Sequence, residues 1–384
     1  MPLYPSTIKS KLPGVGTTIF TTMTALANES KAINLSQGFP DFDSEPELIS
    51  LVNSYMKKGM NQYAPMQGIL SLRKEISDKT KELYGADYDP ETEINITSGG
   101  TQAIYTAITA IIRDGDEVIV LEPAYDCYIP AIQLAGGVPV CIALSGPDFK
   151  VDWNVVRKAM TFRTRMIIIN TPHNPAGTIF SKNDFLELER MTKGTEIVVL
   201  SDEVYEHIIF DGHKHESVMN FSGLQERSFV VFSFGKTYHT TGWKMGYCLA
   251  PSNLMAEFRK VHQFVVFTSN TPIQYAMAEY LKNKNYLQLP DFFQKKRDYF
   301  LKLISGSRFT FTPSSGSYFQ LLDYSSITSE KDTSFAVRMT KEFGVASIPV
   351  SVFYQTEPDS KFLRFCFAKK DETLEKAAEF LNKI

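Results

Sequence analysis

Short apolar runs rich in β-branched residues recur along the chain, and each ends in a polar or glycine-containing turn. Runs of this length between turn residues predict buried strands rather than helices. They stand at residues 93–97, 117–121, 166–170, 196–202 and 228–232. Buried strands that alternate with helical patterns are typical of an α/β fold.

Helical periodicity surrounds these strands. Apolar positions at helical spacing predict helices over residues 18–30, 103–112, 251–284 and 286–305. After Gly306 the pattern changes to short strands and turns, at residues 309–313, 316–321 and 362–367. The change in pattern predicts a second, smaller α+β domain.

We therefore divide the chain into three parts. Residues 1–45 are predicted to form an N-terminal arm and part of the small domain, residues 46–285 the large domain, and residues 286–384 the small C-terminal domain. A chain of 384 residues is long for a single core, which agrees with this division.

The composition narrows the class of protein. Apolar residues make up 43% and charged residues 22%, as in ordinary globular enzymes. A net charge of −3 without a basic cluster argues against nucleic acid as a partner. The N-terminus lacks a secretory pattern and no apolar run approaches membrane-spanning length, so we expect no membrane partner and a cytoplasmic protein. The four cysteines form no C-x-x-C pair, and we expect them to be buried free thiols.

One strand leads to a loop at its carboxyl end that carries a lysine, and this is where open α/β sheets bind ligands. Residues 228–232 lead into Ser233 and Lys236, and Lys244 follows eight residues later. A Walker phosphate loop would require a glycine at the position of Val230, so that motif is excluded. We predict that Lys236 binds an aldehyde cofactor as a Schiff base, while Ser233 and Lys244 hold its phosphate. A lysine on a solvated loop is the alternative.

Residues 233–247, Ser-Phe-Gly-Lys-Thr-Tyr-His-x-Thr-Gly-Trp-Lys-x-Gly-Tyr, resemble the lysine segment of class I aminotransferases, which are pyridoxal-phosphate enzymes of fold type I. The segment is most similar to the methionine and kynurenine aminotransferase branch. Further matching motifs extend from Gly38 to Arg364. The resemblance implies a large three-layer αβα domain with a mostly parallel sheet, a small α+β domain, pyridoxal 5′-phosphate (PLP) as the cofactor, no metal, and a homodimer.

A strand, a Gly-Gly turn and the start of a helix follow one another at residues 93–112. The first N–H groups of a helix lack partners within the helix, so such a turn binds anions. In a chain that also carries the lysine segment, this turn is predicted to hold the cofactor phosphate through Gly100, Thr101 and Gln102.

Two strand ends supply side chains for the cofactor ring. Asp202 ends an apolar strand, where a carboxylate is costly unless it meets a cation. Pairing with a protonated pyridine nitrogen meets that need, and Tyr205 can then donate to the ring 3′-oxygen beside Asn174. A helix-capping aspartate is the alternative. Tyr125 matches the family's ring-stacking position, and an ordinary core aromatic is the alternative.

The resemblance implies the remaining roles. The alternatives are a plain Gly/Pro turn at Gly38, a half-buried aromatic at Tyr63 and an edge-strand arginine at Arg364. Gly38 would contact the substrate carboxylate, with Phe39 beside the entrance. Arg364 would bind the same carboxylate with its planar fork. Asn174 would contact both the cofactor and the substrate. Tyr63 would reach across the dimer interface to the cofactor phosphate of the other subunit.

The implied reaction is transamination between an L-amino acid and a 2-oxo acid. Lys236 would move a proton from Cα to the cofactor, and Asp202 would keep the pyridine cationic. Dicarboxylate-specific relatives use a second arginine, and residues 261–290 contain none. We therefore expect donors with uncharged side chains: methionine, aromatic amino acids, and glutamine or kynurenine as further candidates. Candidates for an apolar wall are Phe39, Tyr63, Tyr125, Phe267 and Phe353.

Two alternatives stay open. A PLP-dependent C–S β-lyase of the same fold would use almost the same site and differ in its leaving-group chemistry. A non-catalytic cofactor-fold protein with a binding or regulatory role is the alternative from another class. Fold-level resemblance does not rank the donors or identify the oxo-acid acceptor.

Overall fold

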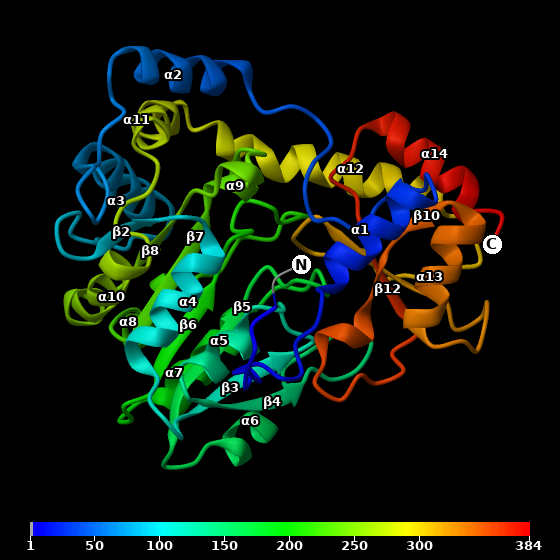
Figure 1. The fold of residues 1–384 in the computed structure, drawn as a ribbon, viewed down its shortest axis with the longest axis horizontal. Coiled ribbons are helices and arrows are strands. Elements are labelled where there is room, and N and C mark those ends of the chain that lie inside the picture. Colours follow the sequence, from blue (N-terminus) through cyan, green and yellow to red (C-terminus); the bar gives the residue numbers. More distant parts are fainter. Residues whose placement is uncertain (1–2) are drawn as a thin grey trace.

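A seven-stranded sheet lies at the centre of the larger part of the molecule (Figure 1), in residues 3–384 that this computed structural model describes. Its strands, in spatial order, are β2 (Ile94–Thr97), β8 (Gly246–Leu249), β7 (Ser228–Ser233), β6 (Val198–Asp202), β5 (Thr164–Asn170), β3 (Glu117–Glu122) and β4 (Val138–Ala143). Only β8 runs against its neighbours β2 and β7. The predicted mostly parallel sheet is therefore confirmed, and all five predicted strands are present.

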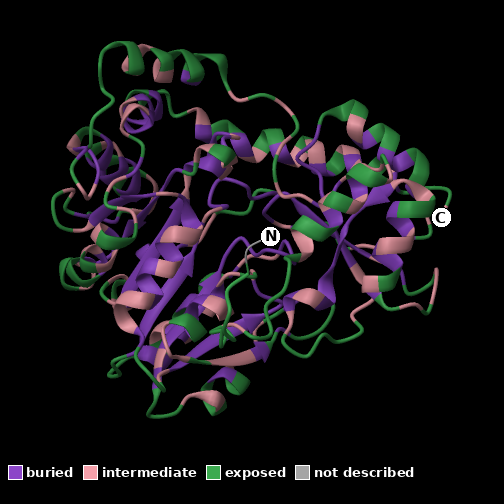
Figure 2. Cartoon of the chain, viewed as in Figure 1, coloured by how far each residue is buried: buried purple, intermediate pink, exposed green. Residues whose placement is uncertain are grey.

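Alternate side chains of each strand point to opposite faces of the sheet, so the strands that are apolar throughout can be buried on both faces. In β5, Met166 and Ile168 pack with the helices of one face, whereas Ile167 and Ile169 pack into the core of the other. The strands are buried while the outer helices expose one side (Figure 2). The result is the predicted three-layer αβα arrangement.

The helices around this sheet are α2 (Pro46–Lys57), α3 (Leu70–Tyr84), α4 (Gly100–Ile111), α5 (Tyr128–Leu134), α6 (Trp153–Ala159), α7 (Lys182–Thr192), α8 (Ser222–Gln225), α9 (Phe234–Thr237), α10 (Ser252–Val265) and α11 (Thr271–Tyr280). Helices α4 to α9 connect the strands of this sheet, α2 and α3 precede its first strand, and α10 and α11 follow its last one. Short 3₁₀ turns are η1 (Val218–Asn220), η2 (Thr241–Trp243), η3 (Leu281–Asn283), η4 (Asn285–Gln288) and η5 (Val350–Phe353).

The smaller part is built on two short sheets. One pairs β1 (Ile33–Asn34) in parallel with β10 (Val345–Ala346), and the other has the order β11 (Ile348–Pro349), β12 (Phe362–Cys366), β9 (Phe319–Asp323). Its helices are α1 (Ile19–Glu29), α12 (Leu289–Leu303), α13 (Asp332–Phe343) and α14 (Asp371–Leu381). Because β1 joins the C-terminal β10, the N-terminal segment packs with the last third of the chain. The domain boundaries themselves stay a prediction.

Three local predictions were wrong. The helix expected over 251–284 is divided into α10 and α11, because Asn270 caps a new helix that has Pro272 in its first turn. Residues 309–313 form only an isolated bridge at Thr310. Cys248 and Cys366 are buried free thiols as expected, but Cys127 and Cys141 are half-buried. Within residues 3–384, no helix has the length and apolar character needed to cross a membrane.

Candidate functional site

The carboxyl ends of three neighbouring parallel strands meet at one cavity. Asn170 ends β5, Asp202 ends β6 and Ser233 ends β7. This edge of an open α/β sheet is where ligands bind. The cavity has a volume of about 290 Å³. It is lined by Phe20, Gln37, Gly38, Gly99, Gly100, Thr101, Ile104, Tyr125, Asn170, Asn174, Asp202, Val204, Tyr205, Ser233, Gly235, Lys236, Thr241, Lys244, Met245, Phe319 and Arg364.

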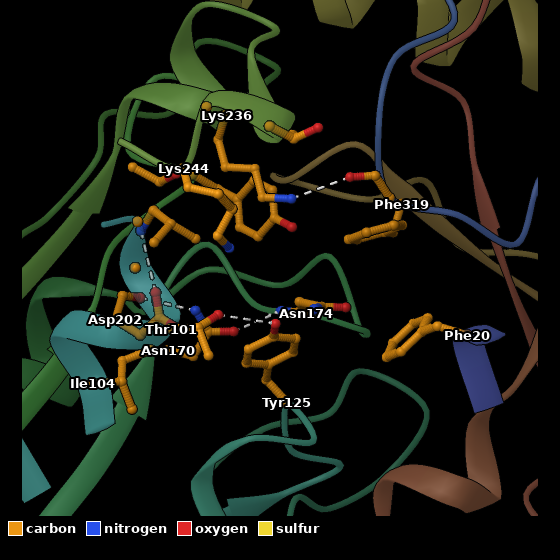
Figure 3. A pocket seen from close by; sticks show the side chains of 18 of the residues that line it. Phe20, Thr101, Ile104, Tyr125, Asn170, Asn174, Asp202, Lys236, Lys244 and Phe319 are labelled. Atoms are coloured by element: carbon orange, nitrogen blue, oxygen red, sulfur yellow. Dashed lines mark hydrogen bonds between the residues drawn. The ribbon is translucent and has the colours of Figure 1, made fainter. Parts of the chain in front are cut away.

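Lys236 approaches the cavity from the one-turn helix α9, whereas a loop was predicted. Lys236 and Lys244 lie on one side of the cavity and Tyr125 on the other (Figure 3). The Lys236 Nζ donates to the carbonyl oxygen of Gly38 at 3.1 Å and to Oη of Tyr318 at 2.8 Å. Burial lowers the pKa of Lys236 to about 8, and the positive charges of Arg364 and Lys244 act in the same direction. At pH 7 about a tenth of an amine with this pKa is neutral and can act as a nucleophile or base, far more than of an ordinary lysine.

Asp202 is buried beneath the cavity and receives only neutral donors. The Tyr128 hydroxyl donates to its Oδ2 at 2.5 Å, and the Val204 N–H lies 3.4 Å from Oδ1. Burial raises the pKa of the Asp202 carboxyl to about 6, against the opposing hydrogen bond from Tyr128. Within residues 3–384, Asp202 forms no salt bridge. A protonated ring nitrogen is the type of partner that such a carboxylate lacks.

The Gly-Gly turn before α4 forms an anion cradle with Lys244. Gly99 has φ +85°, which favours glycine, and a Cβ atom placed on it would lie 3.5 Å from the Lys244 Nζ. The first intrahelical bond of α4 is donated by the Ala103 N–H to the Gly99 carbonyl. The preceding amides of Gly100, Thr101 and Gln102 are therefore available to an anion, with a lysine ammonium beside them.

The backbone N–H of Gln102 and its side-chain amide have different surroundings. The side-chain Oε1 accepts from the Ser98 N–H at 2.9 Å, and Nε2 lies 2.6 Å from the Thr106 hydroxyl and 3.2 Å from Nδ1 of His262. Gln102 is absent from the cavity lining. Any contact of this residue with a phosphate would therefore come from its backbone N–H.

Arg364 is a buried cation without an acidic partner among residues 3–384. Its Nη1 donates to Oδ1 of Asn174 and its Nη2 to the Ser36 carbonyl, both at 2.8 Å, while its Nε has no partner. The guanidinium lies 4.0 Å from the ring centre of Phe319. Burial lowers the pKa of Arg364 to about 10. Such a planar fork fits a carboxylate ligand.

Two further predicted residues lie in the cavity wall. Tyr205 is buried, with its ring edge-on to that of Tyr318. Tyr125 is half-buried, and its hydroxyl lies 3.3 Å from Oγ1 of Thr101. The Asn174 side chain accepts from Arg364 through its oxygen, which leaves its NH₂ group as a donor. These positions agree with a planar ring held between the two sides of the cavity.

Five predicted residues are not part of the lining: Gln102, Phe39, Tyr63, and the apolar-wall candidates Phe267 and Phe353. The Phe39 side chain is 44% exposed, and the Lys369 Nζ lies 4.8 Å from its ring centre. Tyr63 is 82% exposed and packs edge-on against Phe267. The roles assigned to Phe39 and Tyr63 stay predictions.

Other cavity residues were not identified from the sequence. Phe20 comes from α1, and nothing in its local pattern indicates a site (Figure 3). Asn170 was recognised as a strand end but not as a site residue, although its Nδ2 donates to the Asp202 carbonyl and its Oδ1 accepts from the Asn174 N–H. Phe319 was placed on a strand without a role. The rule that strand ends carry site residues could have identified Asn170.

The comparisons with known proteins agree with this geometry. The family described as "Aminotransferase class I and II" matches residues 30–381. The chain is 49% identical to a methionine aminotransferase of Escherichia coli, over 100% of this chain and 99% of that protein. A crystal structure from E. coli whose study reports a methionine aminotransferase function superposes with a TM-score of 0.97, at 49% identity and with full coverage of both chains.

Two more distant relatives extend the similarity. A kynurenine–oxoglutarate transaminase of Dictyostelium discoideum is 34% identical over 96% of this chain and 94% of that protein. The structure of an N-succinyldiaminopimelate aminotransferase from Mycobacterium tuberculosis has a TM-score of 0.94 at 35% identity, covering 98% of this chain and 100% of that one.

Proposed function

The chain belongs to the class I and II aminotransferases, and we propose that its amino donor is an L-amino acid with an uncharged side chain, methionine first among them. It is a fold type I, PLP-dependent amino-acid aminotransferase that uses an amino acid and a 2-oxo acid. Membership of this enzyme family argues against the alternative of a non-catalytic binding or regulatory protein. No contact within residues 3–384 specifically favours the β-lyase alternative.

The residues present fit the cofactor, which supplies an electron sink for the substrate carbanion when it is bound. Lys236 would hold it covalently. Ser233, Lys244 and the amides of Gly100, Thr101 and Gln102 would hold its phosphate. Asp202 would pair with the ring nitrogen, Asn174 and Tyr205 would donate to the ring 3′-oxygen, and Tyr125 would stack on the ring. The support is the set of buried groups without partners: a carboxylate without a cation and helix amides without acceptors.

We assign the steps to residues of this chain. Arg364, with Gly38 beside it, binds the substrate carboxylate and orients Cα toward Lys236. The free Lys236 amine takes the proton from Cα, and the ammonium so formed gives that proton up again as the amino group is transferred. Asp202 would stay ionised beside the ring nitrogen that the cofactor supplies. One water molecule would hydrolyse the C=N bond to release the 2-oxo acid, and a second 2-oxo acid would use the same residues in the reverse direction.

The donor preference rests on one observation above all, the absence of a free cation for a second carboxylate in the cavity wall. The cations in the lining are Lys236, Lys244 and Arg364, and each already has a role. The rest of the wall includes Phe20 and Phe319, which present apolar ring surface to a substrate side chain. A thioether packs well against aromatic rings. The methionine aminotransferase of E. coli supports the same substrate class.

A panel of donors tests this proposal. With one fixed 2-oxo acid acceptor, kcat/KM is expected to be highest for methionine and aromatic amino acids, and at least about 100-fold lower for aspartate and glutamate, because a buried carboxylate without a partner is costly. Highest kcat/KM for aspartate would refute the donor assignment and leave the aminotransferase family unaffected.

The proposal includes a homodimer in the cytoplasm, with Tyr63 serving the partner's cofactor site. The support is a groove lined by Met56 and Tyr63 from one segment and by residues 268–272 from another. The exposed ring of Phe267 packs edge-on against Tyr63 beside this groove. Contiguous exposed apolar side chains mark association surfaces. The free thiols fit a reducing compartment.

A further inference from the structure

The free amine of Lys236 is held by two oxygen atoms, and one of them belongs to a side chain that has no role so far. The Nζ donates to Oη of Tyr318 at 2.8 Å and to the Gly38 carbonyl at 3.1 Å. The Tyr318 hydroxyl in turn donates to the same Gly38 carbonyl. The three groups come from α9, from the segment before β9 and from the segment after β1.

Tyr318 is fixed in place from several directions. Its side chain is fully buried. On one side of it the Ser317 N–H donates to the Ile208 carbonyl at 2.8 Å, and on the other the Phe367 N–H donates to the Tyr318 carbonyl at 3.1 Å. Its ring packs edge-on against Tyr205, with 5.1 Å between the ring centres. The hydroxyl therefore has little freedom to move away from Lys236.

The hydrogen-bond directions limit what Tyr318 can do. A phenol has one proton, and here the proton goes to the Gly38 carbonyl, so the hydroxyl can only accept from Lys236. Burial raises the pKa of Tyr318 well above its usual value, which keeps the phenol neutral. A neutral amine has two N–H groups and one lone pair. Because two acceptors occupy both N–H groups of Lys236, its lone pair occupies the remaining direction of the nitrogen.

We propose that Tyr318, together with the Gly38 carbonyl, is a positioning residue that orients the free amine of Lys236 so that its lone pair points toward the substrate Cα. The inference rests on the proposed role of Lys236 in proton transfer. The proton leaves Cα for Nζ, where it forms the third N–H of the ammonium, and that same N–H gives it up again. Tyr318 keeps its own proton throughout.

Tyr318→Phe removes the hydroxyl and keeps the ring. Tyr324→Phe is the matched control, because Tyr324 is also fully buried and its hydroxyl donates to the Glu330 carbonyl at 2.9 Å, away from the cavity. In single-turnover reactions with methionine, Tyr318→Phe is expected to slow conversion about 10-fold to 100-fold, as for a misplaced catalytic group. The kinetic isotope effect measured with methionine deuterated at Cα should rise, because proton transfer becomes slower than the other steps. The control should match the wild type in both respects.

A second measurement needs no cofactor. The ionisation of Lys236 in the cofactor-free protein can be followed by NMR with ¹³C at Cε, and the charged groups around it, Asp202, Lys244 and Arg364, are retained in every variant compared. Loss of an acceptor that stabilises the ammonium should lower the pKa of Lys236 in Tyr318→Phe and leave it unchanged in Tyr324→Phe. Should Tyr318→Phe fail to fold, 3,5-difluorotyrosine at position 318 keeps the shape and weakens the acceptor, and the same shifts are expected with smaller size.

The outcomes separate two claims. If the wild type fails to convert methionine in a single turnover, the proposed function is contradicted. If the wild type converts methionine and Tyr318→Phe has the same rate, isotope effect and Lys236 ionisation, then the orienting role of Tyr318 is contradicted and the proposed function stands.

Discussion

The hydroxyl of Tyr128 donates to Oδ2 of Asp202 at 2.5 Å, and both side chains are buried. A neutral phenol can satisfy the hydrogen-bonding capacity of this oxygen, but it cannot balance the charge of an ionised carboxylate. The cofactor-free protein therefore holds an acid whose charged form is disfavoured. The cation that the proposed cofactor ring would supply is what this acid lacks.

The stability of the cofactor-free protein should depend on Asp202 in a defined pH window. The Asp202 carboxyl keeps its proton up to about pH 6 in the folded state but only up to about pH 3.8 in the unfolded state. The stabilisation that comes from this difference is therefore fully present below pH 3.8 and is lost as the pH rises through 6. The difference is about 3 kcal/mol at most. Urea unfolding at pH 4 and pH 7 should show a larger loss for the wild type than for Asp202→Asn. Equal losses in both proteins would contradict the assignment.

Lys236 should capture PLP as an amine with a pKa near 8. Only the neutral amine attacks an aldehyde, so the capture rate of the cofactor-free protein should rise from pH 6 and level off above about pH 8. The visible absorption of the lysine-bound cofactor reports the rate. Lys236→Ala should show no such band and lose activity by about 100-fold to 10,000-fold. A rate that still rises about tenfold between pH 8 and pH 9, as for a lysine of ordinary pKa, would show that burial does not lower this pKa.

Arg364→Lys should weaken substrate binding far more than cofactor binding. A lysine keeps the charge but loses the bidentate fork, and the Nη1 bond to Asn174 is lost with it. We expect KM for methionine to rise about 100-fold, while the cofactor band is unchanged. Arg338→Lys is the control, since Arg338 pairs with Glu330 outside the cavity. A normal KM in Arg364→Lys would remove this residue from the substrate site.

Mixing two defective variants tests whether Tyr63 acts across a dimer. Tyr63→Ala should lack the residue that serves the partner's site, and Lys236→Ala should lack its own lysine. In a random mixture about half of the dimers are hybrids with one complete site each, so activity should reach up to about a quarter of the wild type. A mixture whose activity does not exceed the average of the two variants measured separately would place Tyr63 outside the partner's site.

The cavity residues at the carboxyl ends of the strands could be predicted from the sequence, because each of them ends a buried apolar run. Runs such as residues 228–232 are apolar throughout, since helices cover both faces of the sheet, and a polar residue ending such a run is easy to recognise. Asp202 and Lys236 were found in this way. Asn170 ends its strand in the same manner and could have been found by the same rule.

Other features depend on contacts between distant parts of the chain. Phe20 reaches the cavity and Tyr318 reaches Lys236 from segments outside the main sheet, and each looks locally like a core aromatic. The helix α9 has a single turn, too short for a periodic pattern. The strand expected at residues 309–313 fails because only Thr310 finds a partner, at the end of β9, and Pro313 has no N–H to extend the ladder.

The most direct test of the account is the absorption spectrum of the purified protein with PLP, before and after addition of L-methionine without any acceptor. We predict a visible band from the lysine-bound cofactor, its loss to the shorter-wavelength pyridoxamine form with methionine, and its return with a 2-oxo acid. Absence of the band after cofactor addition would contradict the role of Lys236. A band that responds to L-aspartate and not to L-methionine would contradict the proposed donor.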